Sequence, residues 1–457
     1  MEIFEFENVD SWRFLEYNRA MITLKRKAYD QIAAWKNSKD HKCLLIRGAR
    51  QVGKSFVVSL FANANYEEVL TINFKETPDA AEIFSGNLDV KSMVMAMRFR
   101  YPDYSITPEK TLIFLDEIQE CEEAVTSLKF WAMDNSFDVI ASGSMLGIDY
   151  KRASSFPVGY VDFLDMYGLD FEEFLWSQNI NSYMISELRQ MFIDNTPVPP
   201  AVHSKMMTLF RTFIGIGGMP EVVRQFTETG DFRVADKTQR ELLQGYQYDI
   251  AHYATAEEKL KAEKCFLSLS RQLLGKENHK FQYKEVEHNG KAQKYYSSLE
   301  WLVRADMIKL ARNVTFPLFD LEDFSIADNF RVYTSDLSLL LAMRDYSLKM
   351  QIVENSLTGT TKGGIYECAI ADILTKKPYS IWFYRNETKK QEIDFLIQKE
   401  GTVIPIEVKS GNTRATSLNS IMKNNPEIQL AYKLIDGNVG EPENRILSIP
   451  LYMAMFL

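Results

Sequence analysis

Short apolar runs alternate with amphipathic stretches over the first third of the chain. Apolar residues at helical spacing predict a helix over residues 21–37. Four apolar runs of strand length follow, at residues 43–47, 69–74, 111–117 and 137–143. Strands that are apolar on both faces usually lie in a parallel sheet covered by helices. The pattern therefore predicts an α/β fold with a parallel sheet in residues 1–160.

Three further regions follow, each with its own pattern. Residues 161–260 are helical and amphipathic and are expected to form a helical lid. Residues 261–345 combine two or three helices with a short β ribbon, which suits a winged-helix-like module. Residues 346–457 begin with a helix and continue in strands, as in a second α/β domain. A chain of 457 residues is long enough for this division.

Composition narrows the class of partner. Apolar residues make up 46% of the chain and the formal net charge is −9, which argues against a surface coated with basic residues for nucleic acid. Residues 271–312 hold nine Lys and Arg against five Asp and Glu, a balance of +4, so either a local DNA-binding face or a solvated charged surface fits. We expect a cytoplasmic protein without a membrane partner, because the sequence shows no signal-peptide pattern and no apolar run of membrane-spanning length.

Residues 48–55 read GARQVGKS and match the pattern GxxxxGK[ST] in full. An apolar strand pattern precedes the motif and an apolar helix pattern follows it, as a phosphate-binding loop requires. Glycines let the backbone approach phosphate oxygens, and successive N–H groups then bind the anion. Lys54 is expected to reach the β- and γ-phosphates of ATP, and the Ser55 hydroxyl to hold Mg²⁺. The expected nucleotide-binding residues are Gly48, Ala49, Arg50, Gln51, Val52, Gly53, Lys54, Ser55 and Phe56.

Two acidic residues end a buried strand pattern further along. Four apolar residues lead directly to Asp116 and Glu117. We expect Asp116 to hold the Mg²⁺ through water, and Glu117 to orient and polarise the attacking water. Ser142 and Ser144, at the end of the next strand pattern, are candidates for sensing the γ-phosphate, although small residues are also common in turns. Arg152 is a candidate for the arginine that stabilises the transferred charge.

Taken in order, the motifs of the whole chain resemble those of prokaryotic AAA-type P-loop ATPases whose C-terminal part is a domain of unknown function related to restriction-endonuclease-like folds. The segments that carry the resemblance are GARQVGKS, LDEIQ, DFEEFL (170–175), GGMPEVV (217–223), FQYKEV, SLEWLV (298–303), VYTSDLSLL (332–340), EIDFLI (392–397) and IPIEVKSG (404–411). The chain departs from that pattern at Tyr160, Gly168 and Leu337, where a basic residue, a proline and a glycine are usual.

A second polar constellation lies in the last region. Alternation along two strand patterns places Asp394 on one strand, and Glu407 with Lys409 on the next, opposite to their apolar neighbours. Glu367, on the preceding helix, is in a position to join them. The resemblance implies the arrangement of PD-(D/E)xK nucleases, in which carboxylates hold Mg²⁺ or Mn²⁺ and the lysine stabilises charge or activates water. The alternative is a hairpin that carries one ion pair.

The sequence therefore predicts an AAA-type ATPase that hydrolyses ATP and is coupled to a nuclease-like domain. One alternative is an ATP-regulated, Mg²⁺-dependent nuclease. Another is a nucleotide-switched module that binds a protein partner without cleaving nucleic acid. Residues 363–457 hold eleven Lys and Arg against eleven Asp and Glu, whereas a dedicated nuclease more often has an evident basic groove. ATP and Mg²⁺ are the expected cofactors, DNA or protein is the expected partner, and the oligomeric state stays open.

Overall fold

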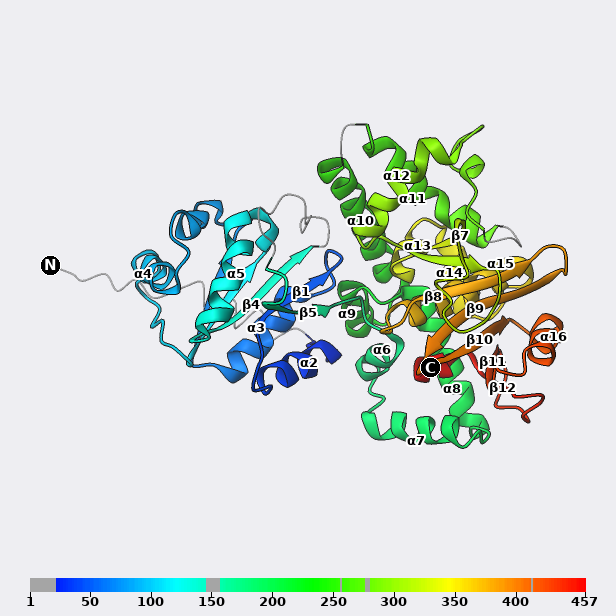
Figure 1. Cartoon of the computed structure of the whole chain (residues 1–457). Helices are drawn as coiled ribbons and strands as arrows, with labels where there is room; N and C mark the ends of the chain where they lie inside the picture. Colours follow the sequence, from blue (N-terminus) through cyan, green and yellow to red (C-terminus); the bar gives the residue numbers. More distant parts are fainter. Residues whose placement is uncertain (1–21, 145–156, 255–256, 276–279, 412–413) are drawn as a thin grey trace.

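The computed structural model describes residues 22–144, 157–254, 257–275, 280–411 and 414–457. Its N-terminal lobe contains a five-stranded sheet of order β2-β3-β4-β1-β5, in which neighbouring strands are parallel (Figure 1). The strands are β1 (Cys43–Gly48), β2 (Glu68–Asn73), β3 (Thr111–Asp116), β4 (Asp138–Ser144) and β5 (Val161–Asp165). The predicted α/β fold with a parallel sheet is confirmed.

Helices cover both faces of this sheet, which explains why its central strands are apolar throughout. Along β3, Phe114 packs in one hydrophobic cluster with Phe61, while its neighbour Leu115 packs in another with Met93 and Trp131. The helices of this lobe are α2 (Lys27–Lys36), α3 (Lys54–Asn65), α4 (Val90–Arg100) and α5 (Glu122–Asp134), with the 3-10 turns η1 (Pro78–Phe84) and η2 (Ile118–Glu120).

Strand β5 corrects the predicted start of the helical region at residue 161. The segment Val161–Asp165 pairs in parallel with β1 at the edge of the sheet. Its sequence, VDFLD, mixes polar and apolar residues, and its burial is mixed as well. An edge strand with one exposed face does not produce the continuous apolar run that marks the central strands.

Helices connect the two lobes. Helix α6 starts with a capping box, in which Asp170 accepts from the N–H of Glu173 and Glu173 accepts from the N–H of Asp170. Its Phe171 and Phe174 pack against Phe213 of α8. The helices here are α6 (Phe171–Ser177), α7 (Ser182–Ile193), α8 (Pro200–Ile216), α9 (Pro220–Thr229), α10 (Phe232–Tyr253), α11 (Lys259–Leu274) and α12 (Ala292–Arg304), with the 3-10 turn η3 (Tyr283–Glu285).

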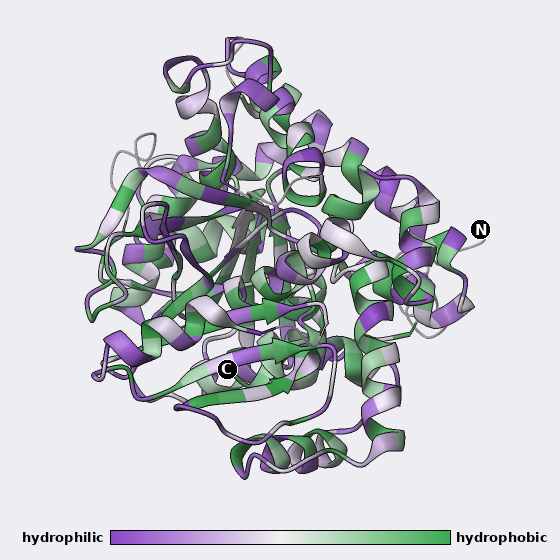
Figure 2. Ribbon diagram, turned by 90° about the vertical axis from the view of Figure 1, so that its right-hand side faces the viewer, coloured by the Kyte–Doolittle hydropathy of each residue, from purple (hydrophilic) through white to green (hydrophobic). Residues whose placement is uncertain are grey.

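The C-terminal lobe is built on a seven-stranded sheet of order β12-β11-β10-β9-β8-β6-β7. Its strands are β6 (Ile308–Val314), β7 (Ser325–Thr334), β8 (Ile381–Asn386), β9 (Gln391–Lys399), β10 (Thr402–Lys409), β11 (Ala431–Ile435) and β12 (Ile446–Pro450). Its helices are α13 (Leu337–Ala342), α14 (Tyr346–Val353), α15 (Gly359–Thr375) and α16 (Thr416–Asn424), with the 3-10 turn η4 (Leu451–Phe456). Figure 2 shows hydrophobic residues along the strands near the C-terminus.

This sheet crosses the predicted boundary between residues 345 and 346. Strands β6 and β7 form the antiparallel ribbon expected in the middle module, but β6 also pairs in parallel with β8. The ribbon is therefore continuous with the C-terminal sheet. The pairing of β6 with β8 joins segments far apart in the chain, and periodicity within one segment carries no signal for such a contact. Among the described residues, no helix is both long and apolar enough to cross a membrane.

Candidate nucleotide-binding site and a buried carboxylate cluster

The loop between β1 and α3 has the backbone that GARQVGKS predicts. A Cβ on Gly48 would lie 2.0 Å from the carbonyl oxygen of Met166, so only glycine fits there without a backbone shift. Gly53 has a φ of 88°, in the left-handed region that favours glycine, and it caps α3. Helix α3 begins at Lys54, with its first N–H groups free of partners within the helix. This combination suits the binding of a phosphate.

Lys54 is a buried cation within this loop. Its Nζ donates to the carbonyl oxygens of Gly48 (3.1 Å) and Ala49 (2.8 Å). Burial lowers the pKa of Lys54 below its usual value, and the charges of Glu117 and Asp116 offset part of that shift. A charged phosphate oxygen is a stronger partner for this ammonium than a neutral carbonyl.

Asp116, at the end of β3, lies beside the start of α3. Its Oδ2 accepts from the Ser55 hydroxyl (2.9 Å) and from the Asn73 amide (3.3 Å). Its Oδ1 accepts from the Ser142 hydroxyl and from the N–H of Glu117 (3.1 Å). A hydroxyl and a carboxylate in contact are oxygen ligands of the kind that Mg²⁺ prefers. Ser55 and Asp116 therefore fit a magnesium ion next to a bound phosphate.

Glu117 follows in an unusual backbone conformation. Its φ is 52°, in the left-handed region that glutamate rarely adopts. Its Oε2 accepts from the amide of Gln119 at 2.5 Å. Strain of this kind is frequent at active sites, where the surrounding structure imposes it. Glu117 directly follows Asp116, and its charge opposes the lowering of the pKa of Lys54 by burial.

The two serines at the end of β4 differ in their surroundings. Ser142 donates its hydroxyl to Asp116, so it orients that carboxylate. Ser144 pairs in register with Gly48, the first residue of the phosphate loop, and is buried. Ser144 thus lies nearer to the expected phosphate position. Arg152 lies outside the described residues.

A cavity of about 250 Å³ adjoins the phosphate loop. Its apolar lining comes from three places: Leu24 before α2, Phe56 and Val57 on α3, and Pro220 at the start of α9. Gly53 of the loop also lines it. An apolar cavity beside a phosphate-binding loop suits the base of a nucleotide. Helix α9 of the helical region therefore supplies one wall of the candidate site.

Sequence reasoning does not single out two arginines that line this cavity, Arg26 and Arg224. Arg224, one turn into α9, pairs with Glu221 (2.5 Å) and Glu228 (2.7 Å). Arg26 is buried and donates to the carbonyl oxygen of Val52, inside the phosphate loop, at 2.8 Å. The sequence offers one signal for Arg224, because it directly follows the segment GGMPEVV. It offers none for Arg26, whose partners are distant in the chain.

Helix α10 contacts the same loop from another side. The side chain of Arg50 pairs with the buried Asp249, and the Tyr246 hydroxyl donates to the carbonyl oxygen of Arg50 at 3.0 Å. Burial raises the pKa of Asp249, and the charge of Arg50 opposes that rise. Arg50 is among the residues predicted to bind the nucleotide, and its side chain also joins the loop to α10.

The C-terminal carboxylates gather around a cation that comes from β7. Arg331 is 1% exposed, and its Nη1 donates to Glu367 Oε1 (2.8 Å) and to the carbonyl oxygen of Asp394 (3.3 Å). Its Nη2 pairs with Glu392. The Tyr333 hydroxyl also donates to Glu367, at 2.7 Å. Sequence reasoning misses Arg331, because it stands on a strand assigned to a different domain.

The other two predicted residues pair with each other on β10. Lys409 Nζ lies 2.5 Å from Glu407 Oε1. Glu407 is buried, and within the described part of the chain its Oε2 has no hydrogen-bond partner. Burial, followed by the charges of Glu407 and Glu367, raises the pKa of Asp394 well above its usual value.

The second metal site, predicted at Glu367, Asp394 and Glu407, is not shown by the structure. Among the residues that the structure describes, no group of three His, Cys, Asp or Glu is arranged to hold a metal ion. The physical reason is that Arg331 supplies the positive charge. It pairs with Glu367, and its charge also acts on Asp394 and Glu407.

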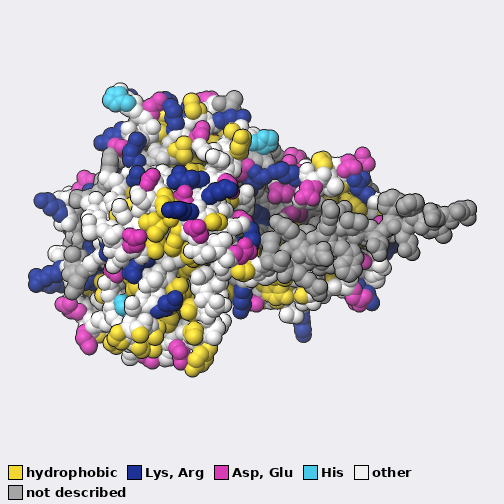
Figure 3. Space-filling view, turned by 180° about the vertical axis from the view of Figure 1, so that it is seen from behind, with side chains coloured by type: hydrophobic (Ala, Val, Ile, Leu, Met, Phe, Trp, Pro, Cys, Tyr) yellow, Lys and Arg dark blue, Asp and Glu magenta, His cyan; other side chains and the backbone are white. Residues whose placement is uncertain are grey.

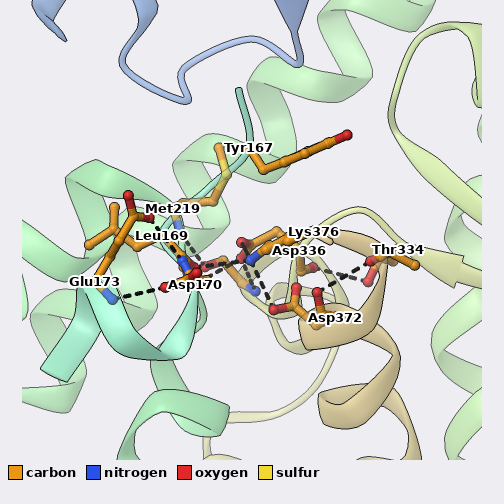
Figure 4. A network of polar contacts seen from close by, with 12 residues as sticks. Tyr167, Leu169, Asp170, Glu173, Met219, Thr334, Asp336, Asp372 and Lys376 are labelled. Carbon is orange, nitrogen blue, oxygen red and sulfur yellow. Dashed lines mark hydrogen bonds and ion pairs between the residues drawn. The ribbon is translucent and has the colours of Figure 1, made fainter. Parts of the chain in front are cut away.

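A further buried network joins the helical region to the C-terminal lobe (Figure 4). Lys376, just after α15, has its Nζ within reach of Asp372 (2.8 Å), Asp336 (3.1 Å) and the carbonyl oxygen of Leu169 (3.0 Å). Asp336 also accepts from the N–H of Gly218 at 2.9 Å. We call Lys376, Asp372 and Asp336 the lysine joint. All three side chains are buried.

We expect the wild-type protein to lose stability as the pH rises from about 4 to about 7, and the variant Asp372→Asn to lose less over the same range. Burial raises the pKa of Asp372 to about 7, with Asp336 contributing and Lys376 opposing. The folded protein therefore holds this proton more tightly than the unfolded chain does, so raising the pH through that window destabilises the fold. Thermal unfolding of wild type and variant across the window is the measurement. An identical pH dependence in both would contradict it, and Asp323→Asn, at an exposed position, is the control.

Comparison with known proteins agrees with the geometry of the first site. Residues 40–175 match the family model of an AAA domain. Residues 207–350 and 362–452 match two models described as domains of unknown function, DUF8612 and DUF4143. No curated protein matches the chain.

Among the solved structures that are similar to the chain are the following three, all with TM-scores below 0.3. The Aeropyrum pernix ORC1 protein in complex with DNA is 12% identical, with 72% of this chain and 91% of that chain covered and a TM-score of 0.24. Drosophila ORC bound to DNA is 11% identical, with coverages of 72% and 93% and a TM-score of 0.27. The Thermotoga maritima RuvB Holliday junction branch migration motor is 14% identical, with coverages of 64% and 90% and a TM-score of 0.28.

The assignment of the N-terminal lobe thus rests on the family match and on the site itself. Both the matched residues and the described geometry place a phosphate loop, a serine hydroxyl and a strand-end carboxylate at one edge of a parallel sheet. The N-terminal lobe is therefore similar to an AAA domain over residues 40–175 and carries a P-loop on a parallel sheet.

Proposed function

We propose that this protein binds ATP with Mg²⁺ at the phosphate loop and hydrolyses it to ADP and phosphate. One observation carries the proposal: the Ser55 hydroxyl lies 2.9 Å from the Asp116 carboxylate, directly beside the first turn of α3. Mg²⁺, when bound there, neutralises phosphate charge. The other parts of the site surround this contact.

Each residue has a role that follows from its place. Lys54 turns from its two carbonyl partners to the β- and γ-phosphates and stabilises the charge that spreads over them. Glu117 orients a water for in-line attack on the γ-phosphate and accepts its proton. Ser142 holds the Asp116 carboxylate in position, and Ser144, in register with Gly48, is the candidate for contact with the γ-phosphate.

Replacing Lys54 with Ala tests the binding step. We expect the Kd for ATP to rise by about 100-fold or more, because the variant loses charge-assisted hydrogen bonds to two phosphates. Titration calorimetry with Mg²⁺–ATP measures it. Lys39→Ala, at an exposed position before β1, is the matched control and should bind as wild type does. Equal affinity in Lys54→Ala would remove the phosphate loop from nucleotide binding.

For the C-terminal lobe, we propose a binding role switched by nucleotide rather than nucleic-acid cleavage. The order α15, β8, β9, β10, α16, β11 supports a nuclease-like fold, with β10 and β11 parallel. The specific observation against cleavage is the buried Arg331, which pairs with Glu367. Incubating wild type with single- and double-stranded DNA or RNA, with Mg²⁺ or Mn²⁺ and with or without ATP, should give no product. Cleavage that is lost in Asp394→Ala with Glu407→Ala would favour the nuclease instead.

A protein fits better than DNA as the partner. The order α11, η3, α12, β6, β7, with a bridge between Lys280 and Arg331, supports a winged-helix-like arrangement. However, the loop between β6 and β7 exposes Phe316 and Phe319 and carries acidic residues at positions 320, 322 and 323. Acidic side chains repel a phosphate backbone, whereas exposed aromatic rings suit a protein surface. On the face seen in Figure 3, basic and acidic side chains are interspersed.

A further inference from the structure

Residues 167–173, which form the turn after β5 and the start of α6, lie between two buried cations. On one side, Arg26 Nη2 donates to the carbonyl oxygen of Tyr167 (2.6 Å) and Arg26 Nε to Glu173 (3.2 Å). The remaining Nη1 of Arg26 donates to Val52 in the phosphate loop (2.8 Å). One planar guanidinium therefore spans the phosphate loop and both ends of this turn.

The lysine joint holds the middle of the same turn. Lys376 donates to the carbonyl oxygen of Leu169, and the N–H of Leu169 donates to the carbonyl oxygen of Gly218 at 2.6 Å. A Cβ on Gly168 would lie 2.5 Å from Asp336 Oδ2. Proline is usual at this position in the family that the sequence resembles. The glycine at position 168 lets the turn pack closely against the lysine joint. A movement of the turn would therefore change its contacts with the joint.

The two elements that meet at the joint also carry the arginine–carboxylate pair of the C-terminal lobe. Strand β7 holds Arg331, five residues before Asp336, and α15 holds Glu367, five residues before Asp372. Both elements are thus fixed to each other at two places. A shift at one place changes the geometry at the other.

The lysine joint contains a carboxylate oxygen without a hydrogen-bond partner among the described residues. Two buried carboxylates face one ammonium, and Asp372 Oδ1 has no hydrogen-bond partner among the described residues. Figure 4 shows Lys376 between Asp336 and Asp372, with Leu169 on the side of the turn. A buried network with an unsatisfied member is a place where a second arrangement of similar energy is available.

We propose that residues 167–173 are the relay by which the state of the phosphate loop reaches the C-terminal sheet, with Arg26 and Lys376 as positioning residues at its two contacts. The proposal rests on ATP binding at the phosphate loop. When phosphates draw Lys54 and the loop backbone into a new position, the carbonyl of Val52 moves, and Arg26 transfers that movement to the turn. The lysine joint then shifts β7 against α15 and loosens the contact of Arg331 with Glu367.

Hydrogen exchange measured by mass spectrometry tests the relay in the full chain. The background is Glu117→Gln, so that ATP stays bound. Adding ATP should change exchange in β7 and α15, and the variant Lys376→Met with Asp372→Asn should abolish that change while the Kd for ATP stays within about threefold. This pair of substitutions removes the ammonium together with one of the two carboxyl groups that face it. Lys362→Met, which breaks an ion pair with Asp436 near the start of α15 and away from the joint, is the control and should keep the change.

Arg26→Lys provides a second variant with its positive charge retained. A lysine cannot reach Val52, Tyr167 and Glu173 together, so the exchange change should again be lost. If either relay variant folds and keeps the ATP-dependent change, or if bound ATP leaves β7 and α15 unchanged, the relay is overturned. If calorimetry shows no ATP binding at all, the proposed function fails. If ATP binds but exchange in β7 and α15 does not respond, only the relay fails.

Discussion

Replacing Glu117 with Gln is expected to lower the turnover of ATP by about 10²- to 10⁴-fold, the range lost with a general base. Glutamine keeps the size and hydrogen-bonding reach of the side chain but cannot accept the proton of the attacking water. The backbone N–H of residue 117 still donates to Asp116, so the magnesium ligands stay in place. ATP should therefore bind and remain bound.

Release of phosphate under saturating ATP measures this effect, and calorimetry measures the retained binding. The control is Glu122→Gln, at an exposed position in the first turn of α5. Unchanged phosphate release in Glu117→Gln would take the catalytic role from Glu117. Loss of ATP binding would instead show that its side chain is needed to build the site.

Replacing Arg331 with Met is expected to destabilise the C-terminal lobe by about 3–5 kcal/mol, the usual cost of removing one partner of a buried ion pair. Methionine is apolar, so Glu367 would remain buried beside Asp394 with no positive charge against it. The pairing of Arg331 with Glu392 would be lost as well.

Chemical unfolding, monitored by hydrogen exchange in α15 and β9, measures the free energy of unfolding that this lobe loses. Adding Glu367→Gln to Arg331→Met should restore part of the stability, because the second change removes the uncompensated carboxylate. Arg304→Met, at an exposed position on α12, should change stability by less than about 0.5 kcal/mol. A loss of less than about 1 kcal/mol in Arg331→Met would contradict the role given to the buried guanidinium.

The N-terminal lobe is predictable from sequence because its signals are local. The phosphate loop is one continuous segment of the chain. Its glycines allow the required backbone conformation, and its lysine and serine are suited to bind phosphate and Mg²⁺. The central strands stand out because helices cover both of their faces. Strand β5 lacks that signal, since it lies at the edge and its residues are mixed in burial.

The C-terminal lobe is predictable only in part, for a physical reason. The predicted strands are present, with Asp394 on β9 and Glu407 and Lys409 on β10. The cation among them comes from β7, on a strand that pairs with β6 and thereby joins the same sheet. No pattern within one segment predicts that pairing. The position of Arg331 among the carboxylates and the continuity of the sheet therefore cannot be predicted from periodicity.

Contacts between distant segments also explain why Arg26 and Lys376 are invisible in the sequence. Arg26 is a single basic residue just before the start of α2, and Lys376 is one just after the end of α15, an ordinary position for a cation. Their significance depends on backbone carbonyls, those of Val52, Tyr167 and Leu169, which any residue type could provide. Geometry alone identifies them.

Steady-state release of phosphate from ATP by the wild-type protein tests the central claim most directly. We expect turnover that requires Mg²⁺, stops on chelation with EDTA, and disappears in Glu117→Gln although that variant still binds ATP. No phosphate release by a protein shown to bind Mg²⁺–ATP, or release that Glu117→Gln does not alter, would contradict the account.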